Sequence, residues 1–103
     1  MERRKLMQIG RIVGTVVATR KDERLTGHKL MITQRVDVSG KLQGYPIIAV
    51  DTVGAGIGEL VLFTKGTSAR FAANKPQSPI DAAIIGIIDN MDVCEEFMVT
   101  EGD

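Results

Sequence analysis

Glycines and a carboxylate gather between residues 51 and 66, where the chain reads DTVGAGIGELVLFTKG. A glycine-rich loop can bind phosphate, because glycine lets backbone amides approach a ligand closely. The dinucleotide-binding fingerprint spaces its glycines as G-x-G-x-x-G and continues into a helix. Gly54 and Gly56 fit this spacing, but Glu59 occupies the third position, where its carboxylate would repel phosphate, and a strand-like apolar run follows. The pattern therefore predicts a tight strand connection without a cofactor, with positive φ angles or close backbone contacts at Gly54, Gly56 or Gly58.

The pair Asp51-Thr52 raises a second possibility, an aspartic protease of the retropepsin-like kind that assembles its two catalytic carboxylates across a homodimer. An apolar run leads into this pair, and another lies at residues 80–89. In such proteases Gly directly follows the Asp-Thr pair, whereas Val53 intervenes here. Two carboxylates must approach within about 3 Å to share a proton, and an inserted β-branched residue would displace their turn. The dimeric protease is kept only as the alternative function.

The remaining composition predicts no other chemistry. The 13 basic residues balance the 13 acidic ones, and one tyrosine and three phenylalanines are few for stacking on bases, so nucleic-acid binding is not expected. The single cysteine, Cys94, and the single histidine, His28, cannot build a disulfide or a zinc site. No apolar run is long enough to span a membrane. We expect a cytoplasmic protein without a cofactor or a metal.

Short apolar segments rich in β-branched residues must position the loop at 51–66. The pattern predicts five strands and one short helix, with the strands at 9–19, 29–36, 47–51, 59–66 and 80–89 and the helix at 67–73. The connections are too short for crossover helices, so we expect a small, mainly all-β, five-stranded antiparallel barrel of the oligonucleotide-binding (OB-like) type. Residues 7–90 form this domain, residues 1–6 a flexible N-terminal extension and residues 91–103 a C-terminal segment.

Three blocks of the sequence together resemble one family. They read IGRIVGTVVATRKDERLTGHKL, AVDTVGAGIGELVLFTKGTSAR and PIDAAIIGIID, and they fall in order within the stretch from Met7 to Asp89. The blocks are similar to the EutN/CcmL family, the pentameric vertex proteins of bacterial microcompartment shells. Thr67 stands where the family often has serine, which keeps the hydroxyl. The resemblance implies a small β-barrel that assembles into a cyclic homopentamer and caps a corner of a carboxysome-like or catabolic shell without catalysis.

The same resemblance implies partners and a subunit boundary. The partners would be four further copies of the chain and the hexameric and trimeric shell proteins around the vertex. A domain of this size buries only about 60 to 70% of its unfolded surface, so association would bury more. Small residues permit close approach of backbones, and Arg70 could hold the carboxylate of Asp51, Asp81 or Asp89. The residues expected at the interface or pore are Asp51, Gly54, Ala55, Gly56, Gly58, Glu59, Ser68, Ala69, Arg70 and Asp81.

Overall fold

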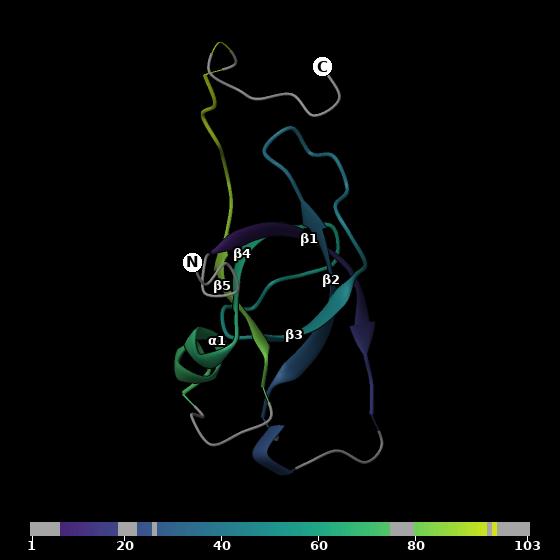
Figure 1. Cartoon of the computed structure of the whole chain (residues 1–103). Helices are drawn as coiled ribbons and strands as arrows, with labels where there is room; N and C mark the ends of the chain where they lie inside the picture. Colours follow the sequence, from purple (N-terminus) through teal and green to yellow (C-terminus); the bar gives the residue numbers. More distant parts are fainter. Residues whose placement is uncertain (1–6, 19–22, 26, 75–79, 95, 97–103) are drawn as a thin grey trace.

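The computed structural model describes residues 7–18, 23–25, 27–74, 80–94 and 96. The expected N-terminal extension, residues 1–6, lies outside the described residues, as does most of the C-terminal segment. Five strands and a helix follow one another along the chain (Figure 1). They are β1 (Gln8–Val16), β2 (Lys29–Val36), β3 (Ile47–Asp51), β4 (Leu60–Lys65), α1 (Thr67–Ala72) and β5 (Ala82–Ile87), with a 3₁₀ turn at Glu23–Leu25 between β1 and β2.

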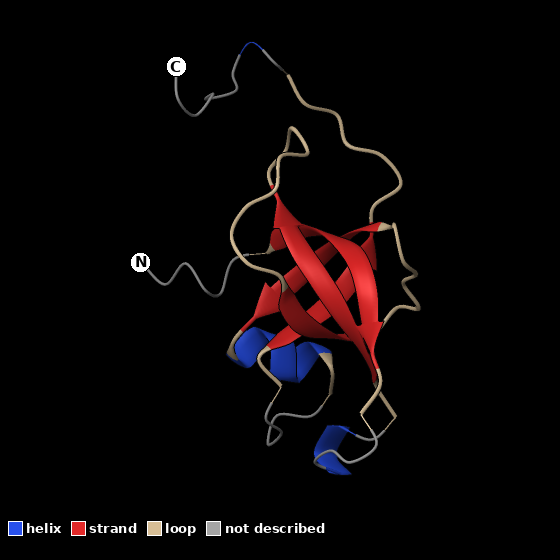
Figure 2. Cartoon of the chain, turned by 90° about the vertical axis from the view of Figure 1, so that its right-hand side faces the viewer, coloured by secondary structure: helices blue, strands red, loops and turns tan. Residues whose placement is uncertain are grey.

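The five strands close into a barrel in the order β1-β2-β3-β5-β4, and β4 pairs with β1 (Figure 2). The predicted barrel with one short helix is confirmed. The prediction of a purely antiparallel barrel is wrong at one seam, because β3 and β5 pair in parallel, with Val50 opposite Ala83. The chain between these strands contains β4 and α1, which is long enough to carry it back to the same end of the barrel.

Strand β1 pairs irregularly with β2. Its pairing with β2 shifts between Ile12, which lies opposite Thr33, and Gly14, which lies opposite Ile32. Val13 is therefore an extra residue on β1, as in a β-bulge. A Cβ atom at Gly14 would approach the Cδ1 atom of Ile32 to 3.2 Å, so a larger residue there would require the end of the Ile32 side chain to shift slightly.

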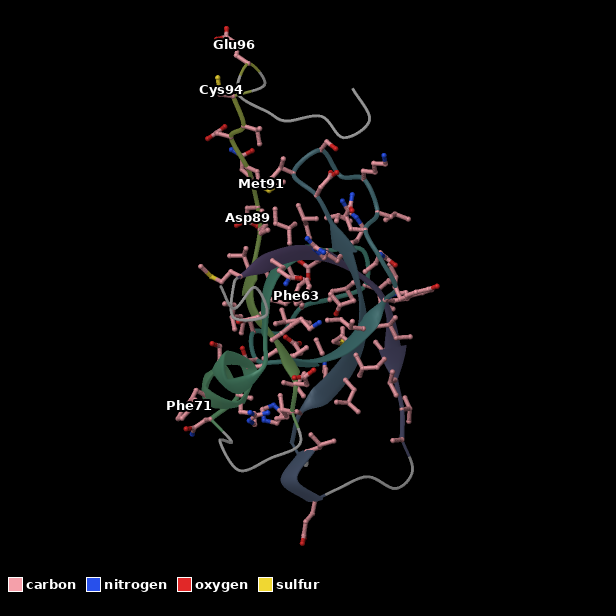
Figure 3. The ribbon with its side chains drawn as sticks, viewed as in Figure 1. Phe63, Phe71, Asp89, Met91, Cys94 and Glu96 are labelled. Atoms are coloured by element: carbon pink, nitrogen blue, oxygen red, sulfur yellow. The ribbon has the colours of Figure 1, made fainter. Side chains whose placement is uncertain are left out.

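Two apolar cores hold the domain together. The barrel interior is filled by alternate residues of the strands, namely Ile12, Met31, Ala49, Val61, Phe63, Ala82 and Ile84, together with Ala55. A second core lies between α1 and the outer face of the barrel, where Ala69 and Ala73 pack with Val50, Ile80 and Ala83. Figure 3 shows Phe63 inside the barrel and Phe71 on the outside of α1. The second core fixes α1 against the barrel, where it contacts β5 and β4.

The β2–β3 connection is a hydrogen-bonded turn organised by Asp37. Its Oδ1 atom accepts the backbone amides of Ser39 at 2.9 Å and Lys41 at 3.0 Å, and also the Ser39 hydroxyl at 2.6 Å. Its Oδ2 atom accepts the side-chain amide of Gln43 at 3.2 Å. These hydrogen bonds, the one from the Ser39 hydroxyl above all, lower the pKa of Asp37 below its ordinary value.

Acidification should loosen this turn. The folded pKa of Asp37 lies below the unfolded value of about 3.9, so ionised Asp37 stabilises the turn above that value and the contribution is lost as the pH falls through the folded pKa. The Ser39 and Lys41 amides should then show smaller protection factors, the intrinsic exchange rate divided by the observed rate, at strongly acidic pH than at pH 6. Asp37→Asn should show that loss already at pH 6, whereas Asp89→Asn should not. Equal protection in all three proteins would contradict this role of Asp37.

Candidate functional site

The glycine-rich segment forms a compact loop, residues 52–59, which we call the glycine loop. Asp51 closes its first half, because its Oδ1 atom accepts the backbone amides of Val53 and Gly54 at 3.0 Å each. Glu59 closes its second half, because its Oε1 atom accepts the amide of Gly56 at 2.5 Å. The two carboxylates therefore serve the turn, and β4 rather than a helix follows. This geometry confirms the predicted connection between two strands.

The glycine loop is fastened to β1 and β5. The amide of Gly58 donates to the carbonyl of Ile12 at 2.7 Å, and the amide of Ile12 donates to the carbonyl of Glu59 at 3.0 Å. The guanidinium of Arg11 donates to the carbonyl of Gly58 at 2.8 Å. On the other side, the hydroxyl of Thr52 donates to the carbonyl of Ile84 in β5 at 2.6 Å. These bonds hold the loop in one position on the barrel.

Gly54 and Gly58 should resist replacement, because their φ angles are 81° and 91°. An L-residue pays roughly 1–2 kcal/mol in this left-handed region. We expect Gly54→Ala and Gly58→Ala each to lower the free energy of unfolding by that amount in urea denaturation. Gly56→Ala is the matched control, since its φ is not in this region and an added Cβ would lie 3.4 Å from Glu59 Oε1. The assignment fails if all three variants are equally stable.

A second group of the predicted site residues lies at the corner formed by α1 and residues 80 and 81, which we call the helix corner. The guanidinium of Arg70 donates to the carbonyl of Ile80 at 3.2 Å. The amide of Gly66 donates to the carbonyl of Asp81 at 2.9 Å, which ties the start of α1 to the start of β5. Ser68 and Arg70 are half-buried and Asp81 is exposed. The helix corner therefore offers polar groups to solvent at a fixed position.

The ten residues expected at the interface thus form two groups. Gly54, Ala55, Gly56, Gly58 and Glu59 belong to the glycine loop, which Asp51 closes from the end of β3, and Ser68 to Arg70 with Asp81 belong to the helix corner. Two of the ten turn inward: Ala55 is 4% exposed in the barrel core and Ala69 is 0% exposed in the second core. Their side chains fill the protomer, and Asp51 is also buried, whereas the other seven positions are half-buried or exposed.

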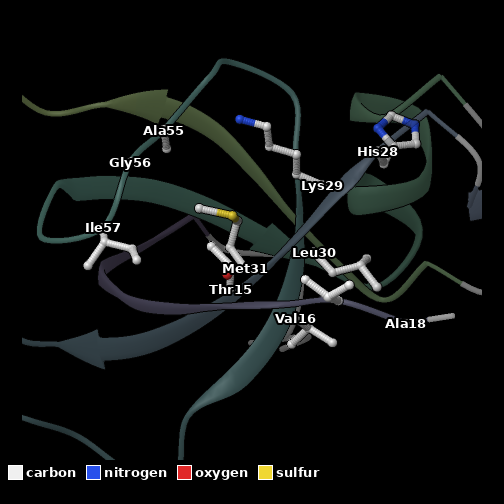
Figure 4. A pocket seen from close by; sticks show the side chains of 11 residues that line it. Thr15, Val16, Ala18, His28, Lys29, Leu30, Met31, Ala55, Gly56 and Ile57 are labelled. Atoms are coloured by element: carbon white, nitrogen blue, oxygen red, sulfur yellow. The ribbon is translucent and has the colours of Figure 1, made fainter.

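An apolar groove of about 470 Å³ runs beside the glycine loop (Figure 4). The loop forms one wall with Ala55, Gly56 and Ile57, and the ends of β1 and β2 form the other. Val17 and Ile57 line this groove with 90% and 66% of their surface exposed. Sequence reasoning did not single out these two residues or Arg11. An apolar residue in the middle of a glycine-rich loop, as Ile57 is, was the available signal.

The arrangement does not support the alternative of a dimeric aspartic protease. Asp51 is 9% exposed, and its carboxylate is engaged by the amides of its own loop. Among the described residues, no three His, Cys, Asp or Glu side chains are grouped so that they could bind a metal ion. None of the helices in the described part of the chain is long and apolar enough to cross a membrane.

The sequence matches known proteins along most of its length. The family model described as ethanolamine utilisation protein EutN/carboxysome matches residues 7–89. The chain is 44% identical over 89 residues to the bacterial microcompartment shell vertex protein PduN of Salmonella typhimurium, which covers 82% of this chain and 98% of PduN. It is 43% identical over 98 residues to the carboxysome shell vertex protein CcmL of Nostoc sp., which covers 94% of this chain and 97% of CcmL.

The fold agrees with a solved structure of the same kind. The GrpN pentameric microcompartment shell protein from Rhodospirillum rubrum superposes with a TM-score of 0.76 at 41% identity. The superposition covers 84% of this chain and 99% of the GrpN chain. Sequence, family model and fold therefore agree over the barrel, its glycine loop and its helix corner, and the chain belongs to the EutN/CcmL family.

Proposed function

We propose that five copies of this chain form a ring that serves as the vertex of a bacterial microcompartment shell. The observation that carries the proposal is the similarity to the pentameric GrpN shell protein, which covers 99% of that chain. A flat layer of hexagonal tiles cannot close into a polyhedron, and a five-fold unit at each corner supplies the curvature. The role is structural, and its partners are the hexameric and trimeric tiles that surround a corner.

Native mass spectrometry of the full chain tests the ring directly. We expect one species with five times the protomer mass at micromolar concentration. A spectrum containing only monomers or dimers would overturn the proposed assembly. Co-assembly with a hexameric shell protein, followed by electron microscopy, then tests the vertex role separately: closed polyhedral particles are expected only when this chain is present, and open sheets or tubes are expected without it.

We infer that the ring joins the glycine loop of one protomer to the helix corner of the next. A closed ring of identical chains requires a heterologous interface, in which two different surfaces of each protomer meet. The groove beside the glycine loop supplies an exposed apolar surface at Val17 and Ile57. The helix corner supplies the exposed ring of Phe71 beside Arg70. A second copy of the chain would bury both surfaces at once.

Arg70 should matter more for assembly than for the protomer fold. Its guanidinium donates to the Ile80 carbonyl, and other donors of the planar group could reach a carboxylate or carbonyl of the neighbouring protomer. Breaking a buried ionic contact costs about 3–5 kcal/mol, whereas an exposed one contributes under about 1 kcal/mol. We expect Arg70→Ala to shift the ring towards monomer, and Arg70→Lys to restore it in part. Unchanged sedimentation and melting of Arg70→Ala would place Arg70 outside the seam.

A further inference from the structure

Arg35 continues a row of inward-facing side chains along β2. Side chains alternate between the two faces of a strand, and on β2 the buried Thr33 is followed on the same face by Arg35. The register between β1 and β2 supports this placement, because Arg35 lies directly opposite Gly10 of β1, and Gly10 is buried. Arg35 is itself exposed, so its side chain belongs to the interior row but reaches solvent where that row ends.

Lys65 ends a second row of inward-facing side chains, along β4. On β4 the buried Phe63 is followed on the same face by Lys65, which lies opposite the buried Ala82 of β5. Both β2 and β4 run antiparallel to β1, so their carboxyl ends lie at the same end of the barrel as Gln8, where β1 begins. We call this end the barrel mouth. Arg35 and Lys65 both line a cavity at this end, together with Phe63.

A small cavity of about 170 Å³ lies at the barrel mouth. The residues that line it include Gln8, Arg35, Gln43, Tyr45, Phe63 and Lys65. None of the described residues that line it is acidic. The carboxylate of Asp37, on the same connection as Gln43, is engaged by its own turn. Two cationic residues and two amide side chains therefore line the cavity, and its described lining contributes no counter-charge.

The buried side-chain amide of Gln34 holds the β2–β3 connection in place beside the cavity. Gln34 is 8% exposed, and its Nε2 atom lies within hydrogen-bond distance of the carbonyls of Arg35, Gln43 and Gly44, at 3.2, 3.0 and 3.1 Å. The backbone amide of Gln43 also donates to the carbonyl of Arg35 at 2.9 Å. The connection that carries Gln43 and Tyr45 is thus fixed over the mouth, so the cavity is a built feature of the fold.

We propose that the barrel mouth binds a small oxyanion of phosphate size. A guanidinium offers two parallel donors to one oxyanion, and an ammonium at the opposite wall can bind another of its oxygens. The volume lies below the roughly 300–1,000 Å³ of pockets that enclose drug-sized ligands, which selects a single phosphate or a short carboxylate over a nucleotide. Phosphate should bind more tightly than acetate, because its oxygens can contact both cations. The site belongs to one protomer and does not depend on the proposed ring.

Titration of the full-length protein with inorganic phosphate, followed by NMR at constant ionic strength set with chloride, tests the site. We expect saturable shifts of the Gln8, Gln43 and Tyr45 amides, and weaker shifts with acetate. Arg35→Gln and Lys65→Gln should each weaken phosphate binding about tenfold, as expected for the loss of one charge-assisted hydrogen bond. Lys41→Gln removes the same charge from an exposed residue on the β2–β3 connection and should leave binding unchanged.

The melting temperature separates this outcome from misfolding. Without phosphate, Arg35→Gln and Lys65→Gln should melt no lower than the parent, because each removes repulsion between two like charges. Phosphate should raise the melting temperature of the parent and of Lys41→Gln but not that of the other two. Linear shifts without saturation, or equal phosphate affinity in Arg35→Gln, Lys65→Gln and Lys41→Gln, would overturn the proposal.

Discussion

Ile57→Glu should yield a folded protomer that no longer closes into a ring. Ile57 is 66% exposed at the tip of the glycine loop, so the isolated barrel tolerates a charge there. At a subunit boundary the same carboxylate would be buried without a partner, which costs several kcal/mol, and every 1.4 kcal/mol changes the association constant tenfold. We expect native mass spectrometry to show monomer, with an unchanged far-UV circular dichroism spectrum. Val38→Glu places the same charge on a residue of the β2–β3 connection that is 46% exposed, and should leave the ring intact.

Mixing two variants tests whether two different surfaces meet. Phe71→Glu places a charge on the helix corner, where Phe71 is 65% exposed, and this variant should also be monomeric. In an equimolar mixture, the intact helix corner of Ile57→Glu can still meet the intact glycine loop of Phe71→Glu. A heterodimer with one working interface is therefore expected, and it cannot grow further. If the mixture stays monomeric while each variant is folded, the pairing of these two surfaces is wrong, although the five-fold ring could still stand on other contacts.

The barrel was largely predictable because its strands are short apolar segments rich in β-branched residues, separated by turn residues. The parallel pairing of β3 with β5 was not, since it follows from how the chain closes around β4 and α1 rather than from a local pattern. Strand ends were also misplaced: the first strand was predicted to continue to Thr19, but β1 ends at Val16. No turn residue marks that end in the sequence.

The candidate site was predictable only in its local part. The positive φ angles at Gly54 and Gly58 could be predicted, because glycine favours turns that need such angles. The hydrogen bond from Arg11 to the Gly58 carbonyl could not, because it joins residues 47 positions apart and no local pattern indicates it. The small residues around Arg70 indicated close contact with a neighbouring subunit. Ala69 instead packs within the protomer, in the second core. The place of Lys65 at the barrel mouth could have been predicted, because it follows Val61 and Phe63 at the two-residue period of a strand.

Gly10→Ala should be among the most destabilising single-methyl additions in the chain. Gly10 lies in the barrel interior with ordinary strand geometry, so backbone strain plays no part. An added Cβ would lie 2.7 Å from Cγ2 of Thr33 and 3.0 Å from Cε1 of Phe63, both of which are almost fully buried. Overpacking of this kind costs about 1–3 kcal/mol. Gly86→Ala is the matched strand control, because its added Cβ would meet Leu62 at an ordinary 3.6 Å, and it should be nearly neutral.

A second substitution decides whether lack of space is the cause. Thr33→Ser removes the Cγ2 atom that the new methyl group would strike and keeps the hydroxyl that donates to the Met31 carbonyl at 3.4 Å. Alone it should cost about 1 kcal/mol for the lost methyl group. Combined with Gly10→Ala it should cost clearly less than the sum of the two, because each change compensates the other in volume. Strict additivity in urea denaturation would show that Gly10 is required for a reason other than the contact with Thr33.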